Sequence, residues 1–547
     1  MLALDFLMLT GLVLCGSQAA SISFSESTGN IVDTGYARYR GNVSYLNTVA
    51  YLGIPYAEPP LGDLRFRAPR PLNTTRVAAA TNGRLVDAKA YPEPCIQGTI
   101  GAGDAGGAGS EDCLKVNIYA PYGATKGSNL PVLVYIHGGG YTFGDPASWP
   151  FDDWIHEQTD VVIVAVYYRL DSFGFLAHPE FRNGTVGDLN PGFLDQLQAL
   201  KWVNQYITAF GGDPNKVTID GESAGGASVE LHLTANESSI PLFHAAIAQS
   251  VYRTPVTLPE QDVHIFDSYA SFAGCGSGSI AEQMDCLLTL ARAQDAVYYN
   301  GSESYTIFHP VVDGEIILDH PTRSILRGQF KKVPLLVGAT SNETLVNTTG
   351  LSVTAALKLY FPSLTELDLE EFAAVYPPSE FPSSDEYFRT ATGEPSVRCA
   401  RTIMGTAFSF FNNTWTYRYN QRDPVQAAND TAVEHAAEMW MMFRGTSSYT
   451  GFNGTATFAP QTPAELAFAA ELHAYWLSFV RSGDPNTYKL DRSPEWPPYS
   501  FDSRNRVVLQ QDSGDTTTTS GVYVEPEPVG ESLRCAFVSS KEYDQQA

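Results

Sequence analysis

The sequence is poor in basic side chains, in cysteine and in long apolar runs. Its 34 Lys and Arg stand against 60 Asp and Glu, which gives a formal net charge of −26. Nucleic acids and anionic membranes bind basic surfaces, so we expect neither as a partner. No stretch reaches the roughly 18 consecutive apolar residues of a membrane-spanning helix. The seven cysteines show no metal-ligand spacing with histidines, so no metal site is expected. These absences describe an acidic chain without a stable membrane anchor.

Residues 1–20 are typical of a secretory signal peptide. An apolar core at 6–15 is followed by small residues, and Ser17 and Ala19 suit cleavage after Ala19 or one residue later. Cleavage removes Cys15 and leaves six cysteines, an even number suited to disulfides in an oxidising compartment. We therefore expect a secreted, extracellular protein that carries N-glycans. Its ten Asn-x-Ser/Thr sequons lie at Asn42, Asn73, Asn183, Asn236, Asn300, Asn342, Asn347, Asn412, Asn429 and Asn453.

The segment Gly221-Glu222-Ser223-Ala224-Gly225 has the G-x-S-x-G pattern of a nucleophile elbow. It follows an apolar, β-branched run at 216–220 and precedes 226–234, which lacks Pro and can begin a helix. Such a strand–turn–helix strains the serine backbone and exposes its hydroxyl, and glycines keep side chains from colliding with the neighbouring strand and helix. A Gly/Ser-rich turn is the alternative. The context favours Ser223 as a nucleophile, with the N–H of Ala224 at a helix N-terminus.

A second glycine-rich segment strengthens this interpretation. His137-Gly138-Gly139-Gly140-Tyr141 directly follows another apolar run, 132–136. Three glycines let backbone N–H groups approach a substrate, and in hydrolases such groups join the one after the nucleophile to hold an oxyanion. A glycine-rich turn would explain either motif alone. It explains less well why both occur, each after its own strand.

A nucleophilic serine needs a base, and in this arrangement the chain order is Ser, Asp or Glu, His. Of the ten histidines, only His435 and His473 lie well into the C-terminal third. His473 sits within 464–480, whose helical apolar spacing favours a packed or surface helix residue. His435 lies in a loop-like lead-in to the apolar run 439–443. We therefore favour His435 as the base over His473.

The acid should lie between the serine and the histidine. A strand-like run at 333–338 is followed by Ala339-Thr340-Ser341-Asn342-Glu343. A carboxylate just past the C-terminal end of a strand lies where open α/β sheets carry ligand-facing chemistry. Asp313 and Glu315 are the competing acids, and their surroundings favour a turn. The pattern favours Glu343, and we expect the neighbouring sequon at Asn342 to be too enclosed for a glycan.

Further segments, spread over essentially the whole mature chain, match one known family. They are Gly53–Pro60, Arg65–Arg67, Ser110–Leu114, Tyr168–Leu170, Phe173–Leu176, Phe210–Pro214, Trp476 and Gly483–Asn486. The chain resembles the type-B carboxylesterases, which include cholinesterases and secreted fungal lipases. This resemblance implies a catalytic triad and an oxyanion hole without a cofactor: Ser223 as nucleophile, Glu343 as acid, His435 as base, and the backbone N–H groups of Gly139, Gly140 and Ala224.

The resemblance implies an α/β-hydrolase fold, with a large, mostly parallel central sheet flanked by helices. Continuous apolar runs such as 161–166 fit strands covered on both faces, and apolar spacing predicts a helix over 195–210. The motifs spread one site over 137–435, so residues 21–547 are expected to form a single domain. The family also suggests two structural ion pairs, Arg65–Glu111 and Arg169–Asp195, and three disulfides, Cys95–Cys113, Cys275–Cys286 and Cys399–Cys535.

The substrate is the property that the sequence specifies least. The loop Ile96–Asp112 has 17 residues with six glycines and no Trp. In fungal lipases of the family this loop is a longer amphipathic lid, and in cholinesterases it carries the tryptophan that binds choline. The resemblance therefore disfavours choline esters and interfacial activation. It implies a broad esterase or lipase acting on small-molecule or lipid esters, such as acylglycerol, sterol, carotenoid or hydroxycinnamate esters.

A non-catalytic, cholinesterase-like adhesion or binding protein is the other class of function. Such members of the family keep the fold but have lost the serine or the histidine. Here Ser223, Glu343, His435 and the glycine-rich segment are all present, and we expect no membrane anchor after the domain. We therefore favour the enzyme.

Overall fold

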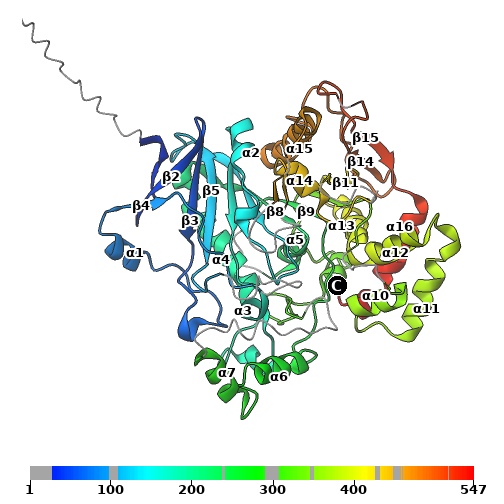
Figure 1. The fold of residues 1–547 in the computed structure, drawn as a ribbon, viewed down its shortest axis with the longest axis horizontal. Coiled ribbons are helices and arrows are strands. Elements are labelled where there is room, and N and C mark those ends of the chain that lie inside the picture. Colours follow the sequence, from blue (N-terminus) through cyan, green and yellow to red (C-terminus); the bar gives the residue numbers. More distant parts are fainter. Residues whose placement is uncertain are drawn as a thin grey trace, which may run out of the picture.

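The fold is built around one sheet of 13 strands. The structure is a computed structural model, which describes residues 28–97, 109–236, 241–289, 307–344, 350–424, 432–447, 457–458, 460–514 and 516–547. In the spatial order given next, the strands from β7 to β14 run parallel to one another, and antiparallel strands extend the sheet at both ends (Figure 1). The spatial order is β1 (Ile31–Asp33), β2 (Arg38–Tyr45), β3 (Thr48–Pro55), β5 (Lys115–Pro121), β7 (Val162–Val166), β6 (Leu130–Ile136), β8 (Gly212–Glu222), β9 (Ala245–Gln249), β10 (Leu335–Thr340), β11 (Thr414–Tyr419), β14 (Asn505–Leu509) and β15 (Tyr523–Pro526), with β4 (Leu85–Ala88) beside β2. This is the mostly parallel sheet of the α/β-hydrolase fold that the resemblance implied.

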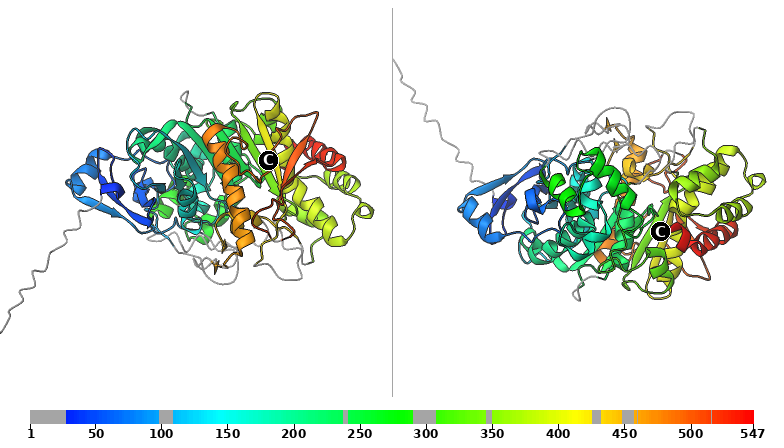
Figure 2. Two further views of the ribbon diagram at one scale, coloured as in Figure 1. Left: turned by 90° about the horizontal axis from the view of Figure 1, so that it is seen from above. Right: turned by 90° about the horizontal axis from the view of Figure 1, so that it is seen from below.

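The central strands separate two hydrophobic cores. Successive side chains of a strand point to opposite faces of the sheet, so Val162 and Val164 of β7 belong to one core while Ile163 and Ala165 belong to the other. All five residues of this strand are buried. Helices cover both faces (Figure 2), which explains why these strands are continuous apolar runs instead of alternating ones.

Among the described residues, helices lie in the connections between the strands, and two more follow the last strand. They are α1 (Thr74–Thr81), α2 (Asp152–Glu157), α3 (Asp171–Phe175), α4 (Pro191–Tyr206), α5 (Ala224–Thr234), α6 (Val263–Phe272), α7 (Ile280–Thr289), α9 (Pro321–Leu326), α10 (Val353–Tyr360), α11 (Glu366–Val375), α12 (Ser384–Gly393), α13 (Cys399–Ser409), α14 (Ala437–Met442), α15 (Pro463–Ser482), α16 (Val529–Ser540) and α17 (Glu542–Gln545). A π-helical turn, Glu394–Arg398, joins α12 to α13. The short strands β12 (Thr446–Ser447) and β13 (Thr457–Phe458) pair with each other.

Three disulfides and two ion pairs brace the fold. The disulfides join Cys95 to Cys113, Cys275 to Cys286 and Cys399 to Cys535, the pairing that the resemblance suggested. The ion pairs are both bidentate: Arg65 binds Glu111 with N–O distances of 2.7 and 2.6 Å, and Arg169 binds Asp195 at 2.7 Å through each oxygen. Paired guanidinium and carboxylate groups of this kind are structural charges.

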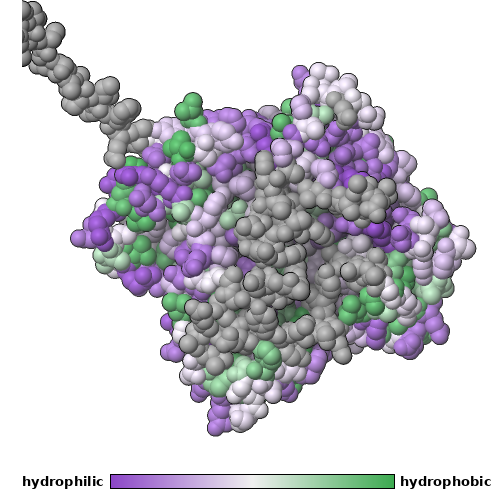
Figure 3. Space-filling model, in the orientation of Figure 1, coloured by the Kyte–Doolittle hydropathy of each residue, from purple (hydrophilic) through white to green (hydrophobic). Residues whose placement is uncertain are grey.

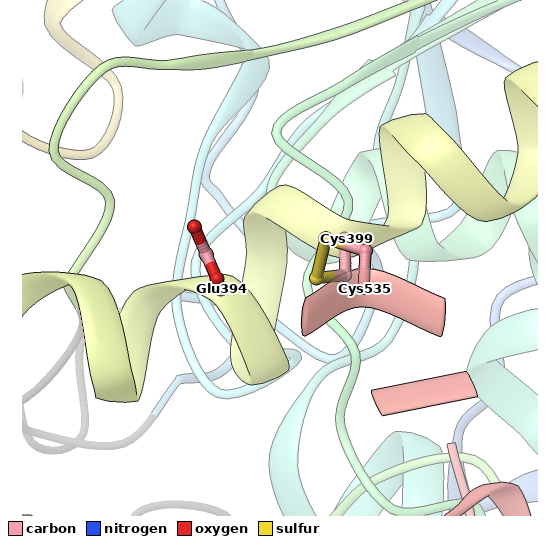
Figure 4. A group of neighbouring side chains, drawn as sticks. All are labelled: Glu394, Cys399 and Cys535. Atoms are coloured by element: carbon pink, nitrogen blue, oxygen red, sulfur yellow. A yellow bond between two sulfur atoms is a disulfide. The ribbon is translucent and has the colours of Figure 1, made fainter. Parts of the chain in front are cut away.

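The carboxylate of Glu394 lies near the Cys399–Cys535 disulfide (Figure 4). These three residues have the donor atoms of a metal site, but the two sulfurs are bonded to each other. Both oxygens of Glu394 accept hydrogen bonds from Arg534, at 2.7 and 2.6 Å. The group is therefore a disulfide beside an ion pair.

Some expectations fall outside the described residues. The signal peptide at 1–20 and most of the loop Ile96–Asp112 are among them. Within the described ranges, no helix combines the length and the apolarity that crossing a membrane requires. The face drawn in Figure 3 is mainly hydrophilic where it is described, with small, separate hydrophobic patches.

Candidate active site

Ser223 stands between a strand and a helix, as the elbow motif predicted. Strand β8 ends at Glu222 and α5 begins at Ala224. The backbone of Ser223 has φ 60° and ψ −120°, a region that residues other than glycine rarely adopt. Strain of this kind is retained where the surrounding structure fixes it, often at functional sites. The turn leaves Ser223 8% exposed, at the carboxyl end of the parallel strands.

The two glycines of the elbow are required by close contacts. A Cβ at Gly225 would lie 2.0 Å from the carbonyl oxygen of Ile136 on β6. A Cβ at Gly221 would lie 2.4 Å from the backbone of Gly225. Real side chains do not tolerate such distances to backbone atoms, so the flanking glycines permit the close packing of strand, turn and helix.

Ser223, His435 and Glu343 form a continuous hydrogen-bonded chain. The Ser223 Oγ lies 2.8 Å from His435 Nε2, and His435 Nδ1 lies 2.6 Å from Glu343 Oε2. One tautomer satisfies both contacts, with Nδ1–H donating to the carboxylate and Nε2 accepting from the serine hydroxyl. His435 is 7% exposed and Glu343 is fully buried. The arrangement can deprotonate the serine and stabilise the resulting imidazolium.

Glu343 and His435 come from loops that follow parallel strands and precede a helix. Strand β10 ends at Thr340, whose backbone N–H donates to Glu343 Oε1 at 2.8 Å. His435 precedes α14, and the next residue, Ala436, has a left-handed backbone with φ 63°. The Thr340 hydrogen bond holds the Glu343 carboxylate within its own loop, next to the end of β10.

The glycine-rich segment lies directly against the elbow. A Cβ at Gly138 would approach the Ser223 Cβ to 2.8 Å and the Glu222 carbonyl oxygen to 2.6 Å. Gly139 and Gly140 have φ of 109° and 61°, and a Cβ at Gly139 would lie 2.0 Å from the Phe143 carbonyl oxygen. Only glycine fits this path comfortably. The role of the Gly139, Gly140 and Ala224 N–H groups stays a prediction.

Two further buried carboxylates lie close to His435. Glu222 Oε1 is 3.4 Å from His435 Nε2, and Glu438, at the start of α14, accepts a hydrogen bond of 3.2 Å from Ser250. Burial raises the pKa of Glu222 to about 7 and that of Glu438 to about 8. Burial lowers the pKa of His435, but the charges of Glu343 and Glu222 outweigh it and raise that pKa to about 9.

Sequence reasoning did not identify Glu438. Its position three residues after His435 is the one signal that could have drawn attention to it. Glu222, next to the nucleophile, was available from the elbow motif, and its place beside His435 suits a supporting carboxylate.

The competing residues have structural partners elsewhere. His473 is buried on α15, where Nδ1 lies 2.7 Å from Glu157 Oε2 and Nε2 lies 2.7 Å from the Met442 carbonyl oxygen. Asp313 Oδ1 accepts the N–H groups of residues 315, 316 and 317 in a turn. Glu315 is an exposed member of that turn. These residues form no part of the hydrogen-bonded chain that ends at Ser223.

Comparison with known proteins identifies the family. The carboxylesterase family model matches residues 28–524. The chain is 31% identical to para-nitrobenzyl esterase of Bacillus subtilis, over 94% of this chain and 100% of that protein. It is 29% identical to secreted lipase 4 of Gibberella zeae, over 85% of each chain. The crystal structure of EstA from Aspergillus niger superposes with a TM-score of 0.81 at 31% identity, covering 94% of this chain and 99% of that one. The chain belongs to the carboxylesterase family and is a carboxylic ester hydrolase with an α/β-hydrolase fold.

Proposed function

We propose that this hydrolase cleaves esters through an acyl-enzyme on Ser223, with His435 as the base and Glu343 as the acid. The observation that carries the proposal is the hydrogen-bonded chain from Ser223 Oγ through the His435 ring to Glu343, with distances of 2.8 and 2.6 Å. The serine oxygen attacks the ester carbonyl while His435 Nε2 takes its proton. Glu343 then faces an imidazolium, which its charge stabilises.

The tetrahedral oxyanion would be held by the N–H groups of Gly139, Gly140 and Ala224. Collapse of this intermediate expels the alcohol, which takes a proton from His435. A water molecule then gives a proton to the same histidine and attacks the acyl-enzyme, releasing the acid and regenerating the Ser223 hydroxyl. Each preorganised donor of such a hole typically contributes about 3 kcal/mol to transition-state stabilisation.

The substrates that we propose are apolar esters of the acylglycerol, sterol, carotenoid or hydroxycinnamate type. The short, glycine-rich loop Ile96–Asp112 lacks both a Trp and the apolar face of a lid. Similarity to a secreted lipase and to a para-nitrobenzyl esterase supports a broad ester specificity. Hydrolysis rates across short and long p-nitrophenyl esters, a sterol ester and a feruloyl ester would rank these classes.

We further propose that the protein is secreted and N-glycosylated, and that residues 21–547 act as one domain. The three disulfides and the density of sequons support an oxidising, extracellular environment. Mass spectrometry of the secreted protein would identify its first residue and the occupied sequons.

The decisive experiment separates this enzyme from a non-catalytic binding protein of the same fold. We expect a fluorophosphonate to label wild-type protein stoichiometrically at Ser223 and to leave folded Ser223→Ala unlabelled. That variant should lose about 10⁴-fold or more in kcat. Turnover close to the wild-type value in Ser223→Ala would refute the assignment.

A further inference from the structure

The loops that carry Glu343 and His435 are joined next to both residues. The backbone N–H of Asn342 donates to the Val433 carbonyl oxygen at 3.0 Å, and the Val433 N–H donates to Asn342 Oδ1, also at 3.0 Å. We call these two bonds the Asn342–Val433 clasp. Asn342 immediately precedes Glu343 and Val433 lies two residues before His435, so the clasp sets the separation of the loops.

Helix α12 supports the clasp from the outside. Glu386 and Arg389 lie about one turn apart on this helix and reach different loops. Glu386 Oε2 lies 3.5 Å from Asn342 Nδ2, and Arg389 Nη1 donates to Glu434 Oε1 at 3.2 Å. Gly393, at the end of the helix, packs so closely on Glu343 that a Cβ there would lie 1.7 Å from its carbonyl oxygen. One rigid helix therefore contacts the acid loop and the base loop.

We propose that Asn342 is a positioning residue, which keeps His435 within hydrogen-bonding distance of Glu343 through the clasp with Val433. The inference rests on the proposed function, because it assumes that the Glu343–His435 contact serves catalysis. Neither loop alone fixes this contact, since the two residues belong to segments far apart in the chain. In the clasp, each of the two residues donates its backbone N–H to the other. Two such bonds between the same two residues restrain both the distance between the loops and their relative rotation.

The sequon Asn342-Glu343-Thr344 offers a competing explanation, namely that Asn342 matters as a glycan acceptor. Its side chain is half-buried and its amide nitrogen faces Glu386. Among the described residues, the buried Thr344 hydroxyl has no hydrogen-bond partner. Thr344→Val therefore abolishes the sequon while keeping the clasp and the side-chain volume, and it serves as the matched control.

Three variants test the clasp against wild-type protein. Asn342→Ala removes the acceptor of the Val433 N–H, and misplacement by about 1 Å can cost about 10²-fold in rate, so we expect kcat to fall about 10- to 100-fold. Asn342→Asp keeps that acceptor but sets a second carboxylate against Glu386, so it is made together with Glu386→Gln. Compared with Glu386→Gln alone, this double variant should keep most of its kcat. Thr344→Val should match the wild-type kcat. The active enzyme in each preparation is counted by fluorophosphonate titration, and folding is checked by thermal unfolding.

Two readouts distinguish positioning from general destabilisation. The KM for p-nitrophenyl acetate should stay within about threefold, because the clasp does not touch the substrate. The acid limb of the pH profile of kcat/KM should move to lower pH in Asn342→Ala, because a more distant Glu343 raises the pKa of His435 less. If Asn342→Ala does not fold, Asn342→Ser is measured with the same expectations, because its side chain is too short for the clasp.

The proposal is overturned by an Asn342→Ala enzyme that keeps the wild-type kcat and pH profile. It is overturned equally if Asn342→Asp in the Glu386→Gln background is as impaired as the alanine variant, or if Thr344→Val shares the loss, which would implicate a glycan. Failure of the proposed function has a different signature, since wild-type protein itself would then not be labelled at Ser223.

Discussion

Replacing Glu343 by Gln tests the acid of the triad with a minimal change of shape. In the native structure, Glu343 Oε1 accepts the Thr340 N–H and Oε2 accepts from His435 Nδ1, at 2.8 and 2.6 Å. A glutamine has one carbonyl oxygen and one NH₂ group. Whichever way it turns, one of these two donors must face another donor.

The expected loss has two sources. A buried carboxylate about 4 Å from the charge centre of the imidazolium contributes about 4 kcal/mol at an effective dielectric constant of 20, and each 1.4 kcal/mol is about tenfold in rate. The wrong histidine tautomer adds to this loss. We therefore expect Glu343→Gln to lower kcat by about 10³- to 10⁴-fold, in line with the serine-protease precedent.

The same substitution also shifts the pH dependence. The charge of Glu343 helps to raise the pKa of His435 to about 9, against the effect of burial. Only the neutral histidine can act as base, so activity falls as the pH drops through this pKa. Without the carboxylate, the pKa of His435 falls, and the acid limb of kcat/KM should move to lower pH.

Asp313→Asn is the matched control, because it also replaces a carboxylate by an amide and should lower the stability by a similar amount. Asp313 Oδ2 accepts from Asn190 Nδ2 at 2.7 Å, so an asparagine there also brings two donors together. Leaving a buried donor unsatisfied costs about 1–3 kcal/mol of stability. We expect a lower unfolding midpoint but an unchanged kcat for the folded enzyme. Equal losses of kcat in the two variants, measured on p-nitrophenyl acetate with folding intact, would refute Glu343 as the acid.

The remaining predictions concern the base, the nucleophile and the loop. Ser223→Ala should fold and escape fluorophosphonate labelling, as described above. His435→Ala should be nearly inactive. His473→Ala should unfold at a lower temperature, because the buried hydrogen bonds of His473 with Glu157 Oε2 and the Met442 carbonyl oxygen are lost, yet keep most of its kcat; the reverse pattern would reject our choice of base. Activity against a sparingly soluble ester should rise smoothly through its solubility limit, because Ile96–Asp112 has only two large apolar residues. An abrupt rise there would reveal a lid elsewhere in the chain.

The elements nearest the site could be located from local patterns. The run 216–220 lies within β8, 132–136 within β6 and 464–480 within α15. The helix expected over 195–210 begins earlier, at Pro191, because Pro fits the first helical position and Asn190 before it is left-handed. Its last turn is a 3-10 helix, and left-handed Gly211 ends it. The first and last residues of a helix depend on such capping residues, which the spacing of apolar residues does not indicate.

Several contacts of the site could not be read from the sequence. Glu438 carries no motif and Asn342 only a glycosylation sequon, and their hydrogen-bond partners Ser250 and Val433 lie far away along the chain. The sequence placed His473 on a packed helix, but its partner Glu157 could not be read from the sequence, because that contact arises only where α15 packs beside Glu157.

The sequence by itself determined the local geometry, which comprises the elbow at Ser223, the glycine-rich segment His137–Tyr141 beside it and the strands that end at both. Glycine spacing and apolar runs specify these features within a few residues, because they act through backbone sterics and burial. Only the tertiary structure decided that Glu343 meets His435 at 2.6 Å, that Glu438 lies nearby and that Asn342 joins the two loops. Those contacts depend on the order of the parallel strands, which brings distant segments to one edge of the sheet.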